Sequence, residues 1–207
     1  MAARIDHGVT NGTFSLDGQT WPVENNVWVV GDDQECVVID APHAADPIAE
    51  LIGNRRLVGI LCTHAHDDHV TVANELADRF DAPIRLHRGD DPLWRMSYRH
   101  LAYEPLVDGQ GIEVAGMALH VLHTPGHSPG AVCFNAPALG AVFTGDTLFQ
   151  GGPGATGRSY SNYETLISSI RYRLFVLPPD TVVHTGHGPD TTIGTEAQAS
   201  LNWNPPA

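Results

Sequence analysis

The sequence contains no lysine, so arginine supplies all 11 basic residues. Against 24 aspartates and glutamates they leave a formal net charge of −13. A surface this acidic repels phosphate backbones and anionic lipid headgroups. The charge therefore argues against nucleic acid or a membrane as partner.

Long apolar runs and clustered cysteines are also missing. No stretch approaches the roughly 20 apolar residues that span a bilayer, and residues 1–8 lack the apolar centre of a secretory signal. The three cysteines, Cys36, Cys62 and Cys133, are far apart, and each lies in an apolar, strand-like run. We therefore expect a cytoplasmic protein with buried thiols and no disulfide framework.

The length and composition are those of an ordinary globular protein, with 207 residues, 42% hydrophobic and 17% charged. A chain of this size buries roughly 70% of the surface that it exposes when unfolded, so a metal is not needed to hold it folded. No segment has the composition of a linker, and no repeat is present. We expect a single domain over residues 1–207, with a short loose tail from about residue 195.

Short β-branched runs alternate with amphipathic segments along the chain. The expected strands are residues 27–30, 36–39, 58–62, 84–86, 112–114, 117–122, 131–134, 141–143 and 181–183. The expected helices are residues 45–52, 70–80 and 163–174. Many strands with a few helices predict an α/β layered sandwich, with helices on the outer faces of packed sheets.

The stretch "THAHDDHV", residues 63–70, crowds three histidines and two aspartates where a strand passes into a helix. In an extended chain, side chains two residues apart share a face, so His64 and His66 can converge on one ion. Asp68 and His69 are adjacent at a helix entrance and point elsewhere. Their geometry indicates a second metal position beside the first.

Three further candidates, His127, Asp146 and His187, each lie in a glycine-bearing loop after an expected strand, in "HTPGHSPG", "TGDT" and "HTGHGP". Loops at a sheet edge are where a rigid scaffold presents its chemistry. Imidazole and carboxylate without thiolate suit zinc, iron or manganese, with a position left for water. We interpret His7, His43, His87 and His100 as packing or surface residues. His120, His123 and His184 lie in or beside the strands that carry the ligand loops, and we favour packing over a hydrogen-bonding role behind the ligands.

These motifs resemble the metallo-β-lactamase fold superfamily. "THAHDDH", "TPGHSPG", "TGDTLF" and "GHGP" match its ligand motifs in order, and the match runs from about Asn25 to Pro189. The resemblance implies a four-layer αββα sandwich. It also implies one metal on His64, His66 and His127, a second on Asp68, His69 and His187, Asp146 bridging the two, and Asp40, which ends "CVVID", close behind the site.

Within the superfamily the pattern is most similar to the glyoxalase II-like hydrolases, which act on hydroxyacylglutathione. The aspartate at 146 separates the chain from the true β-lactamases, and no inserted nuclease module is present. Full-length glyoxalase II enzymes carry a C-terminal helical region that helps to hold glutathione, whereas only about eighteen residues follow "GHGP" here. The resemblance therefore implies the hydrolytic core rather than glutathione specificity.

We expect the protein to be a metal-dependent hydrolase that binds two divalent ions. Zinc is the metal that we expect first, and iron and manganese are the alternatives. A metal-bound hydroxide would cleave a small acyl thioester or ester, with Asp68 and Asp146 as catalytic residues. A thioester suits the site because a thiol, with a reference pKa near about 8.5, leaves as thiolate without a strong general acid. The loop of residues 148–165 offers Arg158 and Tyr160 to the substrate, or is a solvated connection.

Two alternatives remain open from the sequence. One is a mononuclear iron persulfide dioxygenase that uses His64, His127 and Asp146, following the two-histidine, one-carboxylate pattern. The other is a non-catalytic metal-binding module. The number and identity of the bound ions separate the three hypotheses, and the sequence leaves the oligomeric state open.

Overall fold

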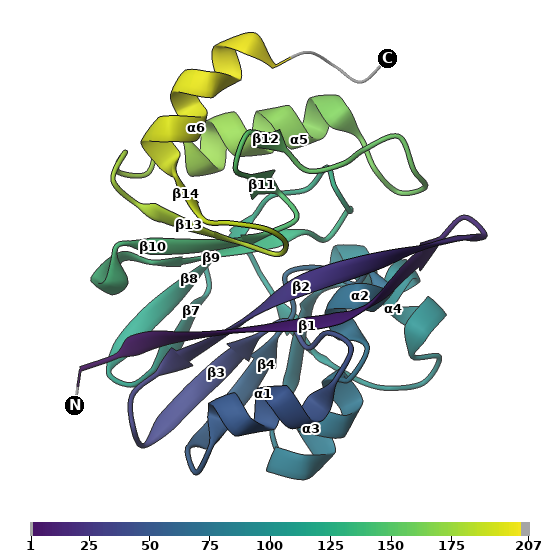
Figure 1. Ribbon diagram of the computed structural model, residues 1–207, viewed down its shortest axis with the longest axis vertical. Coiled ribbons are helices and arrows are strands. Elements are labelled where there is room, and N and C mark those ends of the chain that lie inside the picture. The colour runs from purple at the N-terminus through teal and green to yellow at the C-terminus, as the bar shows by residue number, and fades with distance from the viewer. Residues whose placement is uncertain (1, 204–207) are drawn as a thin grey trace.

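The computed structural model describes residues 2–203 and consists of two six-stranded sheets packed face to face. Helices cover the outer face of each sheet, so the layers follow the order helix, sheet, sheet, helix (Figure 1). This is the four-layer αββα sandwich that the resemblance implies. Among these described residues, no helix is both long and apolar enough to cross a membrane.

The first sheet has the strand order β1-β2-β3-β4-β5-β6. Antiparallel pairing joins its first three strands, and parallel pairing joins β3 through β6. The strands are β1 (Arg4–Leu16), β2 (Gln19–Gly31), β3 (Glu35–Ile39), β4 (Arg56–Leu61), β5 (Ile84–His87) and β6 (Glu104–Leu106). The helices of this half are α1 (Ala45–Ile52), α2 (Asp67–Val70), α3 (Ala73–Phe80) and α4 (Asp91–Ser97).

The second sheet has the strand order β14-β13-β10-β9-β8-β7. Its strands are β7 (Gly111–Val114), β8 (Met117–His123), β9 (Val132–Ala136), β10 (Ala141–Gly145), β13 (Val182–Thr185) and β14 (Thr191–Thr192). Helices α5 (Tyr163–Ser169) and α6 (Ile193–Ala199) cover it, and α5 continues as a short π-helix over Ile170–Leu174. A small pair, β11 (Leu148–Phe149) and β12 (Gly152–Pro153), lies in the connection between β10 and α5.

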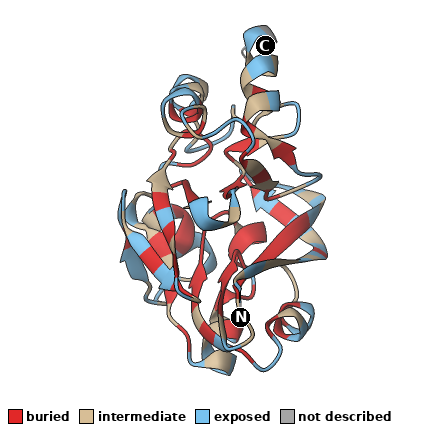
Figure 2. Ribbon diagram, turned by 90° about the vertical axis from the view of Figure 1, so that its left-hand side faces the viewer, coloured by how far each residue is buried: buried red, intermediate tan, exposed pale blue. Residues whose placement is uncertain are grey.

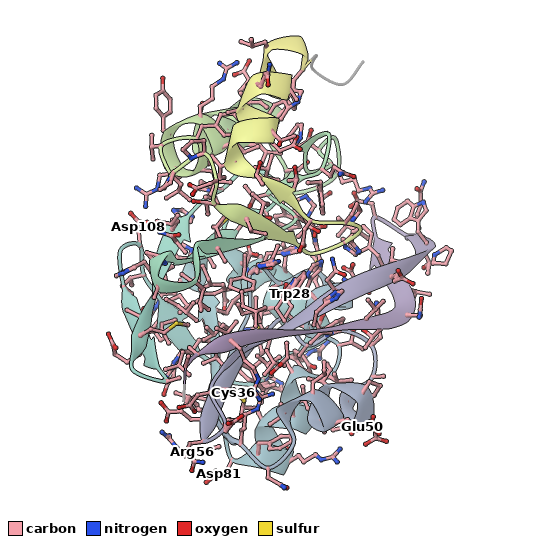
Figure 3. The ribbon with its side chains drawn as sticks, turned by 60° about the vertical axis from the view of Figure 1, so that its left-hand side comes forward. Trp28, Cys36, Glu50, Arg56, Asp81 and Asp108 are labelled. Atoms are coloured by element: carbon pink, nitrogen blue, oxygen red, sulfur yellow. The ribbon has the colours of Figure 1, made fainter. Side chains whose placement is uncertain are left out.

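The central strands are apolar on both faces because each face meets another layer. In β2, Val27 and Val29 pack on the helix side of the first sheet, while Trp28 and Val30 pack between the two sheets. Figure 2 shows the buried residues concentrated in the strands and in the helix faces turned toward them. In Figure 3, Trp28 lies near the middle of the molecule, whereas the labelled charged residues lie at its periphery.

All nine expected strands are present, but β1, β6, β14 and the small pair were not expected. The helix expected over residues 70–80 is divided into α2 and α3, and the one over residues 163–174 becomes a π-helix after Ser169. The loose tail expected from about residue 195 is wrong as far as Asn202, because α6 and a 3-10 turn continue the chain there. The buried carboxylate of Glu196 stabilises this end, accepting hydrogen bonds from Thr191 Oγ1 at 2.7 Å and Gly151 N at 3.1 Å. Residues 204–207 of the expected tail lie outside the described part.

The three thiols should be unreactive in the folded protein. Cys36, Cys62 and Cys133 are all 0% exposed. Burial raises the pKa of the Cys36 and Cys133 thiols to about 11 and that of Cys62 well above its usual value. Because the thiolate is the reactive species, we expect a disulfide reagent such as DTNB at pH 8 to leave native protein unmodified and to titrate 3 thiols in guanidinium. Rapid reaction of any thiol before unfolding would contradict this packing.

Candidate metal centre

The loops that carry the expected ligands meet at one edge of the sandwich. Strands β8 and β10 are both antiparallel to β9, and β13 is parallel to β10, so the carboxyl ends of β8, β10 and β13 lie at the same edge. The loop after β4 joins them from the first sheet. Two backbone hydrogen bonds tie the sheets together here, from Val132 N to Thr63 O and from Asn26 N to Gly186 O, both at 2.8 Å.

Three histidines form the first ligand group. His66 Nδ1 lies 3.1 Å from His64 Nε2 and 2.9 Å from His127 Nε2. Nitrogens bound to one tetrahedral zinc at about 2.05 Å would lie about 3.3 Å apart. This spacing is only slightly wider than the two observed distances. The three side chains are buried, so one divalent cation fits their chemistry and their spacing.

Asp68, His69 and His187 form the second ligand group. His187 Nε2 lies 3.4 Å from Asp68 Oδ2 and 3.3 Å from His69 Nε2, and the last two atoms are 3.6 Å apart. One carboxylate and two imidazoles again suit a divalent transition metal.

Asp146 lies between the two groups. Its Oδ1 is 3.3 Å from His69 Nε2, and its Oδ2 is 3.5 Å from His187 Nε2 and 3.7 Å from His127 Nε2. The carboxylate therefore reaches histidines of both groups. All seven residues expected as ligands come together at this edge.

Four of the five histidines in the centre have their outer nitrogen fixed by an oxygen acceptor. His69 Nδ1 lies 2.8 Å from Asp40 Oδ2, His127 Nδ1 2.9 Å from Ala155 O, and His187 Nδ1 2.6 Å from Glu24 O. Because carbonyl and carboxylate oxygens only accept, these contacts place a proton on the outer nitrogen. The inner nitrogen then turns a free lone pair toward the centre, as in metal-ligating histidines.

Thr63 extends the same arrangement to His64. Its hydroxyl donates to Asp40 Oδ2 at 2.8 Å and lies 3.0 Å from His64 Nδ1, so it accepts the proton of that ring. Asp40 Oδ1 also accepts from Thr63 N at 2.7 Å. Asp40 therefore lies behind the site, as the resemblance implies, and orients one histidine in each ligand group.

The charges of the centre favour a cation. Asp146 Oδ1 is buried and has no hydrogen-bond partner in residues 2–203. Burial lowers the pKa of His66 to about 3. Burial also acts to lower the pKa of His187, but the carboxylates of Asp146 and Asp68 together outweigh it and raise that pKa to about 10. The carboxylates thus favour positive charge at the second ligand group, which a divalent ion would supply.

Two buried residues of the site carry no sequence signal. Asn25 Nδ2 lies 3.2 Å from Asp68 Oδ2, and Asn25 Oδ1 accepts from His43 Nε2 at 2.7 Å. Asp90 Oδ2 accepts from Ala65 N at 2.9 Å and from Ser128 Oγ at 2.8 Å. Since Ala65 separates His64 from His66 and Ser128 follows His127, Asp90 sets the spacing of the first ligand group.

The two expected substrate contacts are placed differently. Arg158 lines a cavity of about 360 Å³ that opens onto His66, Asp68, His127, Asp146 and His187. Tyr160 is 44% exposed, has a positive φ of 69° and is not among the residues that line the cavity. The loop of residues 148–165 therefore brings Arg158 to the site and leaves Tyr160 at the surface.

A model of the metallo-beta-lactamase superfamily matches residues 20–187, most of the chain. The chain belongs to the metallo-beta-lactamase superfamily. Two relatives within it are 34% identical to this chain. One is the "probable metallo-hydrolase YqgX" of Bacillus subtilis, matched over 84% of this chain and 90% of its own length. The other is "hydroxyacylglutathione hydrolase GloC" of Haemophilus influenzae, matched over 86% and 92%.

Solved structures of the superfamily agree with this fold. TTHA1623, in a di-iron-bound form, is 36% identical, with a TM-score of 0.76 over 86% of this chain and 95% of its own. The BLEG-1 B3 metallo-beta-lactamase is 30% identical, with a TM-score of 0.75 over 91% and 97%. The chain is therefore similar both to a di-iron protein and to a protein named as a β-lactamase.

Gly186 keeps the space beside Asp146, which gives a test of the centre. A Cβ at Gly186 would lie 2.4 Å from Asp146 Oδ1 and 2.8 Å from His69 Cε1. We expect Gly186→Ala to weaken binding at the second ligand group by on the order of 10- to 100-fold, as for other changes that move metal ligands. Titration of metal-free protein with zinc against a chromophoric chelator measures this.

Gly111→Ala is the matched control, because a Cβ there meets no atom within 4 Å. It should bind zinc with the affinity of the unsubstituted chain. The circular dichroism spectra of both variants should match the spectrum of the unsubstituted chain. Unchanged affinity for two ions in Gly186→Ala would show that Asp146 does not contact them.

Proposed function

We propose that this chain is a dinuclear metallohydrolase that cleaves small acyl thioesters. The observation that carries the proposal is the position of Asp146, within 3.7 Å of histidines in both ligand groups. In the proposed centre His64, His66 and His127 would hold one ion and Asp68, His69 and His187 the other, and Asp146, which lies between the two groups, would serve both. Zinc is our first choice, and iron or manganese the alternatives. The di-iron form of TTHA1623 supports two sites and keeps iron under consideration.

Two divalent ions at such a site supply a water molecule with a pKa lowered to about 7 and positive charge that polarises a carbonyl. The protein supplies rigid positions for them. Asp40 and Thr63 fix His69 and His64, and Asn25 holds the carboxylate of Asp68. Because a small displacement of reacting groups costs much of the rate, these contacts should matter to activity as well as to affinity.

The cavity favours a thioester over an amide. Apart from the proposed ligands, the ionisable side chains that line it are Glu24 and Arg158. An amine leaving group needs a proton from a general acid, whereas a thiol with a pKa of about 8.5 departs as thiolate. The GloC relative is named for the hydrolysis of an acylglutathione, which is a thioester.

A small molecule suits this site better than a macromolecule. The cavity of about 360 Å³ lies near the lower end of the range of ligand sites, about 300–1,000 Å³. The net charge of −13 disfavours polyanionic partners. Three cysteines without a disulfide are typical of a reducing compartment, so we place the protein in the cytoplasm.

Metal content separates this proposal from its two rivals. Protein purified without added metal should contain about two ions per chain and should hydrolyse thioesters. A single iron, with oxygen consumption on a persulfide, would favour the mononuclear dioxygenase. Protein that binds metal but turns over neither substrate would favour a non-catalytic module.

Substrate preference is the second test, because BLEG-1 makes a β-lactam the natural competitor. We expect turnover of small acyl thioesters with little activity toward penicillins, since a leaving amine needs a general acid and Glu24, the one carboxyl outside the proposed ligands that lines the cavity in the described part of the chain, is exposed to solvent. Steady-state kinetics on a panel of both classes measures kcat/KM for each. A penicillin with a higher kcat/KM than every thioester would reverse the assignment.

Asp146→Asn tests the bridge itself. The amide keeps the volume but removes the charge that offsets repulsion between two cations at short range. We expect lower occupancy at one site and a kcat reduced on the order of 100-fold or more, with a much smaller change in KM. Metal analysis and thioester kinetics on the same sample measure both, and two tightly bound ions with wild-type kcat would exclude a bridging role.

A further inference from the structure

Arg158 differs from most arginines of this chain in lacking an acidic partner. Within residues 2–203, an ion pair of 4.0 Å or less joins each of seven others to an aspartate or glutamate: Arg4, Arg55, Arg56, Arg79, Arg85, Arg95 and Arg173. No ion pair of this kind involves Arg158 in the same part of the chain. In a protein with a net charge of −13, a free guanidinium beside the candidate metal centre is a distinctive feature.

Two aromatic rings hold this guanidinium at the cavity. Arg158 Cζ lies 4.2 Å from the centre of the Trp21 ring and 5.1 Å from that of Phe14. The two rings stack on each other with their centres 5.5 Å apart. Contact with ring faces attracts the cation but does not use its N–H donors. The fork of donors therefore stays available to a planar acceptor such as a carboxylate.

Backbone contacts fix the position of Arg158 relative to the rings. Phe14 and Trp21 lie on the β1–β2 hairpin, whose tip projects at the right of Figure 1. Ser159 N donates to Asp17 Oδ2 at the hairpin turn at 3.0 Å, and Ser161 Oγ donates to Arg158 O at 2.7 Å. The loop and the hairpin, far apart in the sequence, are thus joined at the mouth of the cavity.

Neighbouring acids leave the guanidinium free. Asp17 is engaged by Ser159, whose side-chain and backbone hydrogen bonds lower the pKa of its carboxyl, with a smaller contribution from the charge of Arg158, to which it makes no ion pair in the described part of the chain. Glu24 is the acid outside the proposed ligands that also lines the cavity, and it is exposed and lies beyond 4.0 Å of Arg158. A negatively charged ligand would therefore meet a cation that has no existing partner to displace.

The cavity is thus lined by the cationic Arg158, by the apolar side chains of Phe14, Trp21 and Val23, and by residues of the candidate metal centre. We propose that Arg158, braced by Trp21 and Phe14, binds a carboxylate of the substrate and selects thioesters that carry a free carboxylate a few carbons from the reacting carbonyl. This proposal rests on the proposed thioester hydrolysis. The carboxylate belongs to the thiol half or the acyl half of the substrate, and the test includes both.

Paired substrates test the selection. S-acetyl-3-mercaptopropionate and a succinic monothioester carry the carboxylate on opposite halves, and the carboxamide of each is its neutral partner. We expect Arg158→Gln to raise KM for at least one acid by about tenfold or more, as for loss of a charged hydrogen bond. Its kcat should change less than about twofold, and both amides should be unaffected. Arg158→Lys, which keeps the charge but not the fork, should retain part of the preference.

Arg171→Gln is the matched control, since Arg171 is exposed, lies outside the cavity lining and has no ion pair in the described part of the chain. It should leave every KM unchanged. An equal rise in KM for acids in both variants would reveal a general effect of net charge and would overturn the proposal. Equal KM values for acids and amides in the unsubstituted protein would overturn it as well.

Binding without turnover provides a readout that does not depend on hydrolysis. The probe is the thioether analogue of S-acetyl-3-mercaptopropionate, in which S–CH₂ replaces S–C(=O). Its binding should quench the tryptophan fluorescence of the metal-loaded protein, and Trp21→Phe should remove most of this quenching. We expect its affinity to exceed that of its carboxamide by about tenfold, and Arg158→Gln to abolish the difference.

The two proposals fail in different ways. If the acid binds through Arg158 but no thioester is hydrolysed, the carboxylate subsite stands and the hydrolase assignment fails. If thioesters are hydrolysed but acid and amide bind alike in the unsubstituted protein and in Arg158→Gln, the hydrolase assignment stands and the subsite is excluded.

Discussion

Three carboxylates surround one buried histidine, and the arrangement of the rest of the chain follows from this concentration of charge. His69 lies 2.8 Å from Asp40 Oδ2, 3.6 Å from Asp68 Oδ2 and 3.3 Å from Asp146 Oδ1. His69, Asp40 and Asp68 are at most 3% exposed. Anions this close in a poorly solvated site repel one another strongly unless positive charge lies between them. Positive charge at this edge lowers that repulsion, and a rigid scaffold prevents the carboxylates from separating.

Buried acids supply part of that rigidity. Asp40 directly follows β3 and has the left-handed conformation, with φ of 60°, which aspartate tolerates better than most residues. There its carboxylate reaches Thr63 and His69 on the neighbouring segment. Asp90 does the same for the first ligand group through Ala65 and Ser128. Each acid accepts hydrogen bonds from several donors, which offset part of the cost of burying it and join loops from different strands, although burial still raises the pKa of Asp90.

The residues of the candidate metal centre are predictable from the sequence because part of their signal is local. His64, His66, Asp68 and His69 lie within six positions, and residue type with spacing suffices to predict a metal site there. The central strands are predictable for a similar reason, since burial on both faces makes them continuously apolar. Asn25 and Asp90 were missed because their partners are distant in sequence, Asp68 for the first and Ala65 and Ser128 for the second. No spacing rule relates such residues.

Strand β1 was missed for another reason that bears on specificity. It lies at the sheet edge and mixes exposed polar with half-buried residues, so it lacks the apolar run of an inner strand. Yet β1 contributes Phe14 to the cavity, β2 contributes Trp21, and the turn between them receives the loop that carries Arg158. The proposed chemistry therefore depends on compact motifs at strand ends, whereas the proposed selection depends on contacts between an edge hairpin and a distant loop. Substrate preference can then change through the hairpin and the loop while the candidate metal centre, positioned by Asp40 and Asp90, stays the same.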